Sequence, residues 1–254
     1  LPLNIVYADT SGTVGWQLIG DAPDRRSGTG AVPRPAADPE TGWRPEPVAF
    51  ERMPHLRDPE GGFVATANNL PSAEGSWLGL DFLDGYRVAR ITGALAGRDD
   101  WDVTSTLEFQ MDRASLVWDE IRDPVLAAVE GLPVADLLEE WDGVLSTNSA
   151  AATVFEMLLG ELITAVVAAK APTSAALAMG AGFTPLVPFN SFLVRRVSHL
   201  VRLIREEPDD WFAEGWPSRI REAFRATIGR LEEKHGSDPA GWAWGDVRQL
   251  TLCH

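Results

Sequence analysis

Cysteine is nearly absent from this sequence, which has 254 residues and a single cysteine, Cys253. One thiol cannot form an internal disulfide, and it leaves no cysteine-based metal site. Basic residues are also few, because 22 Lys and Arg stand against 37 Asp and Glu, for a formal net charge of −15. A protein that binds nucleic acid neutralises phosphates with a basic surface. We therefore expect no nucleic-acid partner.

Long apolar runs are missing as well. The longest covers residues 157–169 and is interrupted by Glu161, whereas a membrane-spanning helix needs about 20 apolar residues. The chain opens Leu-Pro-Leu-Asn, with neither the basic region nor the apolar region of a secretory leader. We expect no membrane span.

The signatures of several catalytic sites are absent. The sequence contains no glycine-rich loop ending in Gly-Lys-Ser/Thr, no Gly-x-Ser-x-Gly turn and no His-Glu-x-x-His pair. Its four histidines lie far apart, so a Ser-His-Asp triad would have to assemble from unmarked positions. The ten tryptophans are spread along the chain, which is typical of core and loop anchors. Motifs alone indicate an acidic globular protein without a self-contained catalytic set.

The first part of the chain has the character of strands and loops. Residues 3–19 alternate apolar with smaller or polar side chains around Thr-Ser-Gly-Thr at 10–13, which predicts a hairpin. Residues 20–62 are rich in proline, so we expect a long ordered loop there without regular structure. Residues 62–69 predict a short β-prone run that ends in two amides, Asn68 and Asn69.

From Asp84 onward the periodicity becomes helical. Val88, Ile91 and Leu95 share one helix face, between a predicted cap at Asp84 and a stop at Gly97. The same reasoning predicts further helices over residues 103–122, 124–130, 135–141, 149–170, 191–206 and 218–235.

The tail, residues 242–252, returns to strand-like character. Strands, then helices, then a final strand predict an α+β fold. We treat residues 1–254 as one segment, with a strand and long-loop part over 1–75, a largely helical part over 76–240 and a return strand over 241–254.

Longer sequence patterns follow one another along the chain. They lie at residues 4–16, 20–26, 42–43, 48–50 with Pro54, 58–59, 62–69, 86–91, 109–112, 141–143 and 242–245. The first reads Asn-Ile-Val-Tyr-Ala-Asp-Thr-Ser-Gly-Thr-Val-Gly-Trp, and the sixth reads Gly-Phe-Val-Ala-Thr-Ala-Asn-Asn. In this order the series resembles the β chain of the penicillin acylase (penicillin amidase) family, over essentially the whole chain.

The resemblance implies an N-terminal nucleophile hydrolase, an αββα sandwich of which this chain supplies a part with a largely helical insertion. In such an enzyme, autoproteolysis frees a serine at the start of the β chain; its α-amine acts as the base and its hydroxyl attacks the amide carbonyl. This chain begins with Leu1 instead of serine. We therefore expect an internal segment of the β chain, inactive by itself, whose nucleophile lies elsewhere.

The resemblance also assigns two site residues. Asn68 matches the side-chain donor of the oxyanion hole, and Arg87 matches an arginine that supports this asparagine and can face substrate. Arg90 competes with Arg87 on the same predicted helix. From the residues alone, the favoured interpretation is that the pair Asn68-Asn69 ends a strand in a turn. If the segment is a strand, its pleat directs Asn69 to the opposite face from Asn68.

Cofactors, partners and location follow from the same resemblance. Catalysis is expected to need no cofactor, and a structural calcium ion is compatible with the family. Asp81 or Asp84 could be a remaining calcium ligand, but the spacing does not decide between them, so we assign no metal ligand. The implied partners are the α chain, the N-terminal part of the β chain and a small N-acyl amide substrate. The full-length protein is expected to be periplasmic or secreted.

Two functions remain open at this point. The first is a segment of an amide hydrolase that acts on N-acyl substrates such as β-lactam side chains, acyl-homoserine lactones or lipopeptides. The alternative is a binding or scaffolding protein that has lost the nucleophile and uses its helical part as an interaction surface. A family-like α segment and a processing junction upstream in the reading frame would favour the enzyme.

Overall fold

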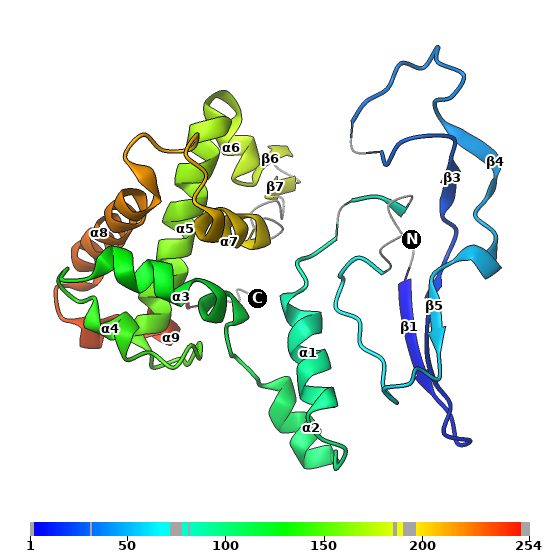
Figure 1. Ribbon diagram of the computed structural model, residues 1–254, viewed down its shortest axis with the longest axis horizontal. Helices are drawn as coiled ribbons and strands as arrows, with labels where there is room; N and C mark the ends of the chain where they lie inside the picture. Colours follow the sequence, from blue (N-terminus) through cyan, green and yellow to red (C-terminus); the bar gives the residue numbers. More distant parts are fainter. Residues whose placement is uncertain are drawn as a thin grey trace. The chain divides into compact units, whose positions relative to one another are not determined.

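The computed structural model describes residues 3–30, 32–71, 78–80, 82–184, 187–189 and 197–249. The chain divides into two compact units, unit 1 (Leu1–Asp102) and unit 2 (Val103–His254), and both are drawn in Figure 1. The first α-helix begins at Tyr86, two residues after the predicted start of the helical periodicity at Asp84, and it belongs to unit 1.

Unit 1 is built on a small antiparallel sheet. Strands β1 (Leu3–Ala8), β2 (Val14–Ile19) and β5 (His55–Arg57) lie in the order β1-β2-β5. The turn between β1 and β2 is held by Asp9, whose Oδ1 accepts hydrogen bonds from the backbone N–H groups of Ser11 (2.8 Å) and Thr13 (3.2 Å). The hairpin predicted for residues 3–19 is confirmed, because its turn chemistry is local.

The proline-rich segment contains more regular structure than its composition predicts. Strands β3 (Pro23–Arg25) and β4 (Trp43–Pro47) pair antiparallel, and a short 3₁₀ helix covers Phe50–Arg52. A buried apolar cluster under these elements comprises Leu18, Ala22, Val48 and Met53, with Trp16 and Leu78 packed against it. Proline is compatible with both strands because each has only one partner strand in the described chain.

Helix α1 (Tyr86–Ala96) closes unit 1. The helix ends at Gly97, as the sequence predicted. The predicted N-cap at Asp84 is wrong, because the N-cap residue is Gly85, which makes no side-chain capping bond. None of its residues is buried.

Unit 2 is largely helical. Its elements are α2 (Val103–Gln110), α3 (Leu116–Val129), α4 (Asp136–Glu139), α5 (Ala150–Lys170), a 3₁₀ turn (Pro172–Ser174), α6 (Ala175–Ala178), β6 (Ala181–Thr184), β7 (Val187–Phe189), α7 (Val197–Glu206), α8 (Gly215–His235), a second 3₁₀ turn (Pro239–Gly241) and α9 (Trp244–Val247). Helix α5 contacts α4, α6, α7, α8 and α9 and forms the centre of the unit (Figure 1).

The core of unit 2 is rich in aromatic rings. Trp118, Trp141 and Phe155 form a trio with ring centroids 5.1 to 5.2 Å apart. On α8, the stripe that the sequence predicted is buried, with Phe224 1% exposed and Ile220 fully buried. Aromatic and aliphatic burial of this kind supplies most of the stability of a helical unit.

Three predictions about unit 2 are wrong. The separate helix expected over 124–130 is the second half of α3, which runs through Pro124. The helix expected over 103–122 is two helices, because Ser115 accepts a hydrogen bond from the N–H of Trp118 and so starts α3 anew. The return strand expected at the tail is also not formed in the described residues, since Trp244–Val247 is the helix α9. Trp242 is fully buried in the core, and its carbonyl accepts a 2.6 Å hydrogen bond from Thr153 of α5. Residues 250–254 of the predicted strand lie outside the described chain.

Among the described residues, α5 alone is long and apolar enough to cross a membrane by length and composition. More than half of its apolar window, 56%, is buried inside the protein. Its one acidic residue within the apolar run, Glu161, forms an ion pair with Arg230 of α8 at 2.5 Å. A central core helix accounts for this composition equally well, so the helix is weak evidence for a membrane span.

We expect the 254-residue chain, produced by itself, to self-associate through β1. One edge of this strand has no partner among the described residues, and Leu3, Ile5, Val6 and Tyr7 are 54%, 43%, 51% and 39% exposed. An exposed apolar edge strand is a template for pairing with another chain. Light scattering at tens of micromolar should report dimers or larger assemblies, and Ile5→Lys should shift them toward monomer. A monodisperse monomer of the unaltered chain would contradict this expectation.

Candidate active site

Residues 58–85 link β5 to α1 and carry the first of the two predicted site residues. The sequence predicted a short strand over 62–69, and this prediction is wrong, because residues 63–66 form no regular structure and 67–69 are bends. The backbone of Gly62 (φ 73°) and of Asn68 (φ 61°) is left-handed, which no β-strand accommodates. The strand-pleat argument for Asn69 therefore fails as well.

The backbone of Asn68 has the left-handed conformation. A left-handed residue costs about 1–2 kcal/mol for most side chains, and asparagine is among the few that adopt it readily. Its carbonyl accepts a hydrogen bond of 2.9 Å from the N–H of Leu83, just before α1. The side chain of Asn68 is exposed.

Arg87, in the first turn of α1, contacts Asn68 directly. Its Nη2 atom donates to the backbone carbonyl of Ala67 at 2.7 Å and to Oδ1 of Asn68 at 2.8 Å. Of the two arginines that the sequence left open, Arg87 makes the contact with the asparagine. The structure thus brings together both residues predicted for the site.

The guanidinium determines which end of the Asn68 amide is available. Arginine has only donors, so the atom that faces Arg87 must be the amide oxygen. The Nδ2 group then points away with two N–H donors, and it donates to no acceptor in the described part of the chain. A charge-assisted bond at the oxygen also polarises the amide and strengthens these donors. The arrangement can stabilise an oxygen that becomes negative.

Asn69 was placed by the strand pleat on the opposite face from Asn68, whereas the structure shows its side chain bonded to the backbone of residues 67 and 70. Its Oδ1 accepts from the N–H of Ala67 at 3.0 Å, and its Nδ2 donates to the carbonyl of Leu70 at 3.0 Å. The two consecutive amides in the sequence were the only signal of these contacts. Its side chain binds backbone on both sides of Asn68.

A comparison with known protein families shows to which family this chain belongs. The penicillin amidase family profile matches residues 1–254. The chain belongs to the penicillin amidase family. The resemblance drawn from the sequence patterns is confirmed.

The relatives of this penicillin amidase family member include acyl-homoserine lactone acylases and penicillin acylases. The chain is 28% identical to the acyl-homoserine lactone acylase QuiP of Pseudomonas syringae pv. tomato, across 98% of this chain and 32% of that protein. It is 31% identical to the penicillin acylase 2 proenzyme of Pseudomonas sp., across 64% of this chain and 22% of that protein. The chain therefore spans about a third of the length of the first of these relatives, and less of the second.

A solved structure supports the fold. The thermostable penicillin G acylase from Alcaligenes faecalis superposes with a TM-score of 0.66 and 19% identity, across 95% of this chain and 48% of that one. The predicted α+β fold class is confirmed, because the chain has the fold of the corresponding part of this acylase.

The expected calcium site of this family member stays a prediction. The described residues contain no cluster of three or more His, Cys, Asp or Glu side chains that could hold a metal ion. Asp84 belongs to the described chain, while Asp81, the other candidate ligand, lies outside it.

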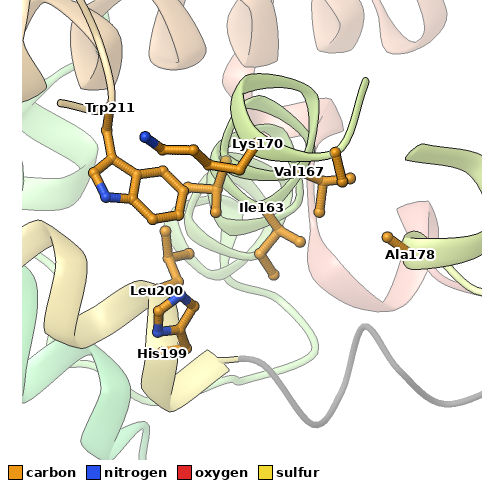
Figure 2. A pocket seen from close by; sticks show the side chains of 9 residues that line it. Ile163, Val167, Lys170, Ala178, His199, Leu200 and Trp211 are labelled. Carbon is orange, nitrogen blue, oxygen red and sulfur yellow. The ribbon is translucent and has the colours of Figure 1, made fainter. Parts of the chain in front are cut away.

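Unit 2 contains a small apolar cavity of about 110 Å³, shown in Figure 2. Its described lining is Ile163, Val166, Val167, Lys170, Ala171, Ala178, His199, Leu200 and Trp211. The Lys170 ammonium lies 5.0 Å from the Trp211 ring centre and 2.8 Å from Oδ2 of Asp210. The hydrogen bond from Lys170 lowers the pKa of Asp210. Because its cation is already paired and its described lining has no Ser, Thr or Cys, the cavity is a weaker candidate than Asn68 and Arg87 for an active site.

Proposed function

We propose that this chain is part of an amide hydrolase in which Asn68 stabilises the oxyanion of the tetrahedral intermediate and Arg87 orients Asn68. The observation that carries the proposal is the 2.8 Å bond from Arg87 to Oδ1 of Asn68, which directs the Nδ2 donors outward. Membership in the penicillin amidase family supports the reaction class.

The chemistry proposed for the whole enzyme begins with an N-terminal serine of the β chain, which the proposal places outside this segment. The serine hydroxyl attacks the carbonyl carbon of the substrate amide, and its own α-amine takes the proton. The carbonyl π electrons move to oxygen, which receives a hydrogen bond from Nδ2 of Asn68. When the tetrahedral intermediate collapses, the C–N bond breaks and the amine leaves with a proton. Water then hydrolyses the acyl-enzyme to release the acid.

Asn68 acts on the transition state more than on the substrate. A neutral carbonyl oxygen gains little from the donor, whereas an oxyanion gains the full strength of a hydrogen bond fixed in advance. The nearby guanidinium adds a positive charge to the same region. Because Arg87 is itself bound to Ala67 and Asn68, it needs no rearrangement during the reaction.

The proposed substrate is a small N-acyl amide. The relatives are named as acyl-homoserine lactone acylase and penicillin acylase, and both names refer to removal of an acyl group from an amide nitrogen. The proposal includes the remaining parts of such an enzyme as partners, a periplasmic or secreted location and no cofactor in the chemical step. To test it, the full-length protein is incubated with an acyl-homoserine lactone and with a penicillin. Release of free acid and amine supports the hydrolase, while no turnover of either favours the scaffolding alternative.

Arg87→Ala in the active full-length enzyme should lower kcat by about tenfold to 100-fold, because a donor displaced by an ångström loses much of its effect. The loss should be smaller than that of removing Asn68 itself. Arg122→Ala, an exposed arginine of α3 with a 3.9 Å ion pair, serves as the matched control. Steady-state kinetics on an N-acyl 4-nitroanilide measures both. A kcat for Arg87→Ala equal to that of Arg122→Ala would remove Arg87 from the site.

A further inference from the structure

The side chain of Asn69 spans the short piece of backbone that carries Asn68. Its oxygen binds the N–H of Ala67, before Asn68, and its nitrogen binds the carbonyl of Leu70, after it, both at 3.0 Å. A planar amide offers an acceptor and a donor in one rigid group. Asn69 can therefore hold both ends of this segment at once.

These contacts replace those that secondary structure would supply. Residues 67–70 belong to no helix or strand, so their N–H and carbonyl groups need other partners. Asn69 is half-buried and serves two of these groups. A backbone group inside the protein that loses its hydrogen-bond partner destabilises the conformation that it holds. Loss of the Asn69 amide should loosen the left-handed turn at Asn68.

The three contacts around Asn68 have different effects. Leu83 donates to the carbonyl of Asn68, and Asn69 ties the backbone on either side, so both hold the main chain. Arg87 holds the side-chain oxygen. The direction of Nδ2 depends on the main chain as well as on the side chain, because the two together set where the amide points.

We propose that Asn69 is a positioning residue for the oxyanion donor: it fixes the backbone of Asn68 so that Nδ2 meets the developing negative charge. This inference rests on the proposed function of Asn68. It assigns Asn69 no contact with the substrate.

The test uses the active full-length enzyme, with an N-acyl 4-nitroanilide as the probe and kcat expressed per titrated active site. Asn69→Ala should lower kcat by about tenfold to 100-fold and leave KM nearly unchanged, since misplacement acts on the transition state. Asn69→Asp keeps the acceptor for the Ala67 N–H and should recover part of the loss. Asn69→Leu, of similar size without hydrogen bonds, should not. Asn148→Ala, the same change at an exposed asparagine of unit 2, is the control.

A double variant separates positioning from general destabilisation. In the Asn68→Ala background, adding Asn69→Ala should lower kcat no further, because no donor is left to position. If Asn68→Ala reduces kcat but Asn69→Ala matches the control, or if the two losses multiply, Asn69 is not a positioning residue and the proposed function stands. If Asn68→Ala itself matches Asn148→Ala, the proposed function fails and this inference fails with it.

Discussion

Asn68→Ala in the active full-length enzyme is expected to lower kcat on an amide substrate by about 10²–10³, with KM largely unchanged. The variant removes the Nδ2 donor that the Arg87 contact directs outward. The oxyanion exists only after the nucleophile has attacked, so substrate affinity should not report the loss. Steady-state assays on an N-acyl 4-nitroanilide measure both kcat and KM.

Asn68→Asp is the sharper companion variant. A carboxylate still accepts from Arg87 and adopts the left-handed backbone, so the local structure should persist. It replaces the donor by an acceptor of negative charge facing the oxyanion, and the loss of kcat should be at least as large as for alanine. Near-normal turnover of both variants would show that Asn68 is not the donor.

Phe224→Ala is expected to destabilise unit 2 by about 3–5 kcal/mol, the usual cost of emptying a large aromatic site in a packed core. Phe224 lies on α8, which packs against α5 and α3, and it is only 1% exposed. Denaturant unfolding followed by circular dichroism, which is dominated by the helices of this unit, measures the change in the free energy of unfolding.

The control for Phe224 is its neighbour in sequence. Arg225 lies on the exposed face of the same helix, and Arg225→Ala keeps a strong helix former there, so it should change stability little. Equal stability of Phe224→Ala and Arg225→Ala would mean that α8 does not bury this face in solution.

The elements that the sequence predicted well are those fixed by local chemistry or by a long periodic pattern. The hairpin β1–β2 depends on a turn whose Asp9 binds its own neighbours, and α5 and α8 each carry an apolar pattern over many turns. The break between α2 and α3 was missed because both sides are helical in pattern. In the structure, residues 111–115 separate them through a bridge between Ala114 and Val144 and the cap at Ser115.

Two further failures share one physical cause, which is contact between residues far apart in the sequence. Residues 62–69 have the composition of a strand, but their backbone partners are side chains or residues up to 20 positions away, as with Arg87 and Ala67. The sequence placed Trp242 in a strand. In the structure its carbonyl accepts a hydrogen bond from Thr153 of α5, and the residue belongs to the core instead. Asn68 and Arg87 were found through the family resemblance. Composition and periodicity alone would have left both as ordinary surface residues.

The left-handed backbone at Asn68 (φ 61°) also restricts how this position can change in evolution. Glycine, aspartate and asparagine enter that conformation at low cost, whereas alanine and branched residues do so poorly. Of the three, only asparagine carries a side-chain N–H₂ group. A lineage that abandons catalysis but keeps the fold is therefore expected to drift to glycine or aspartate here. The residue at this one position then separates catalytic descendants from those retained for another purpose.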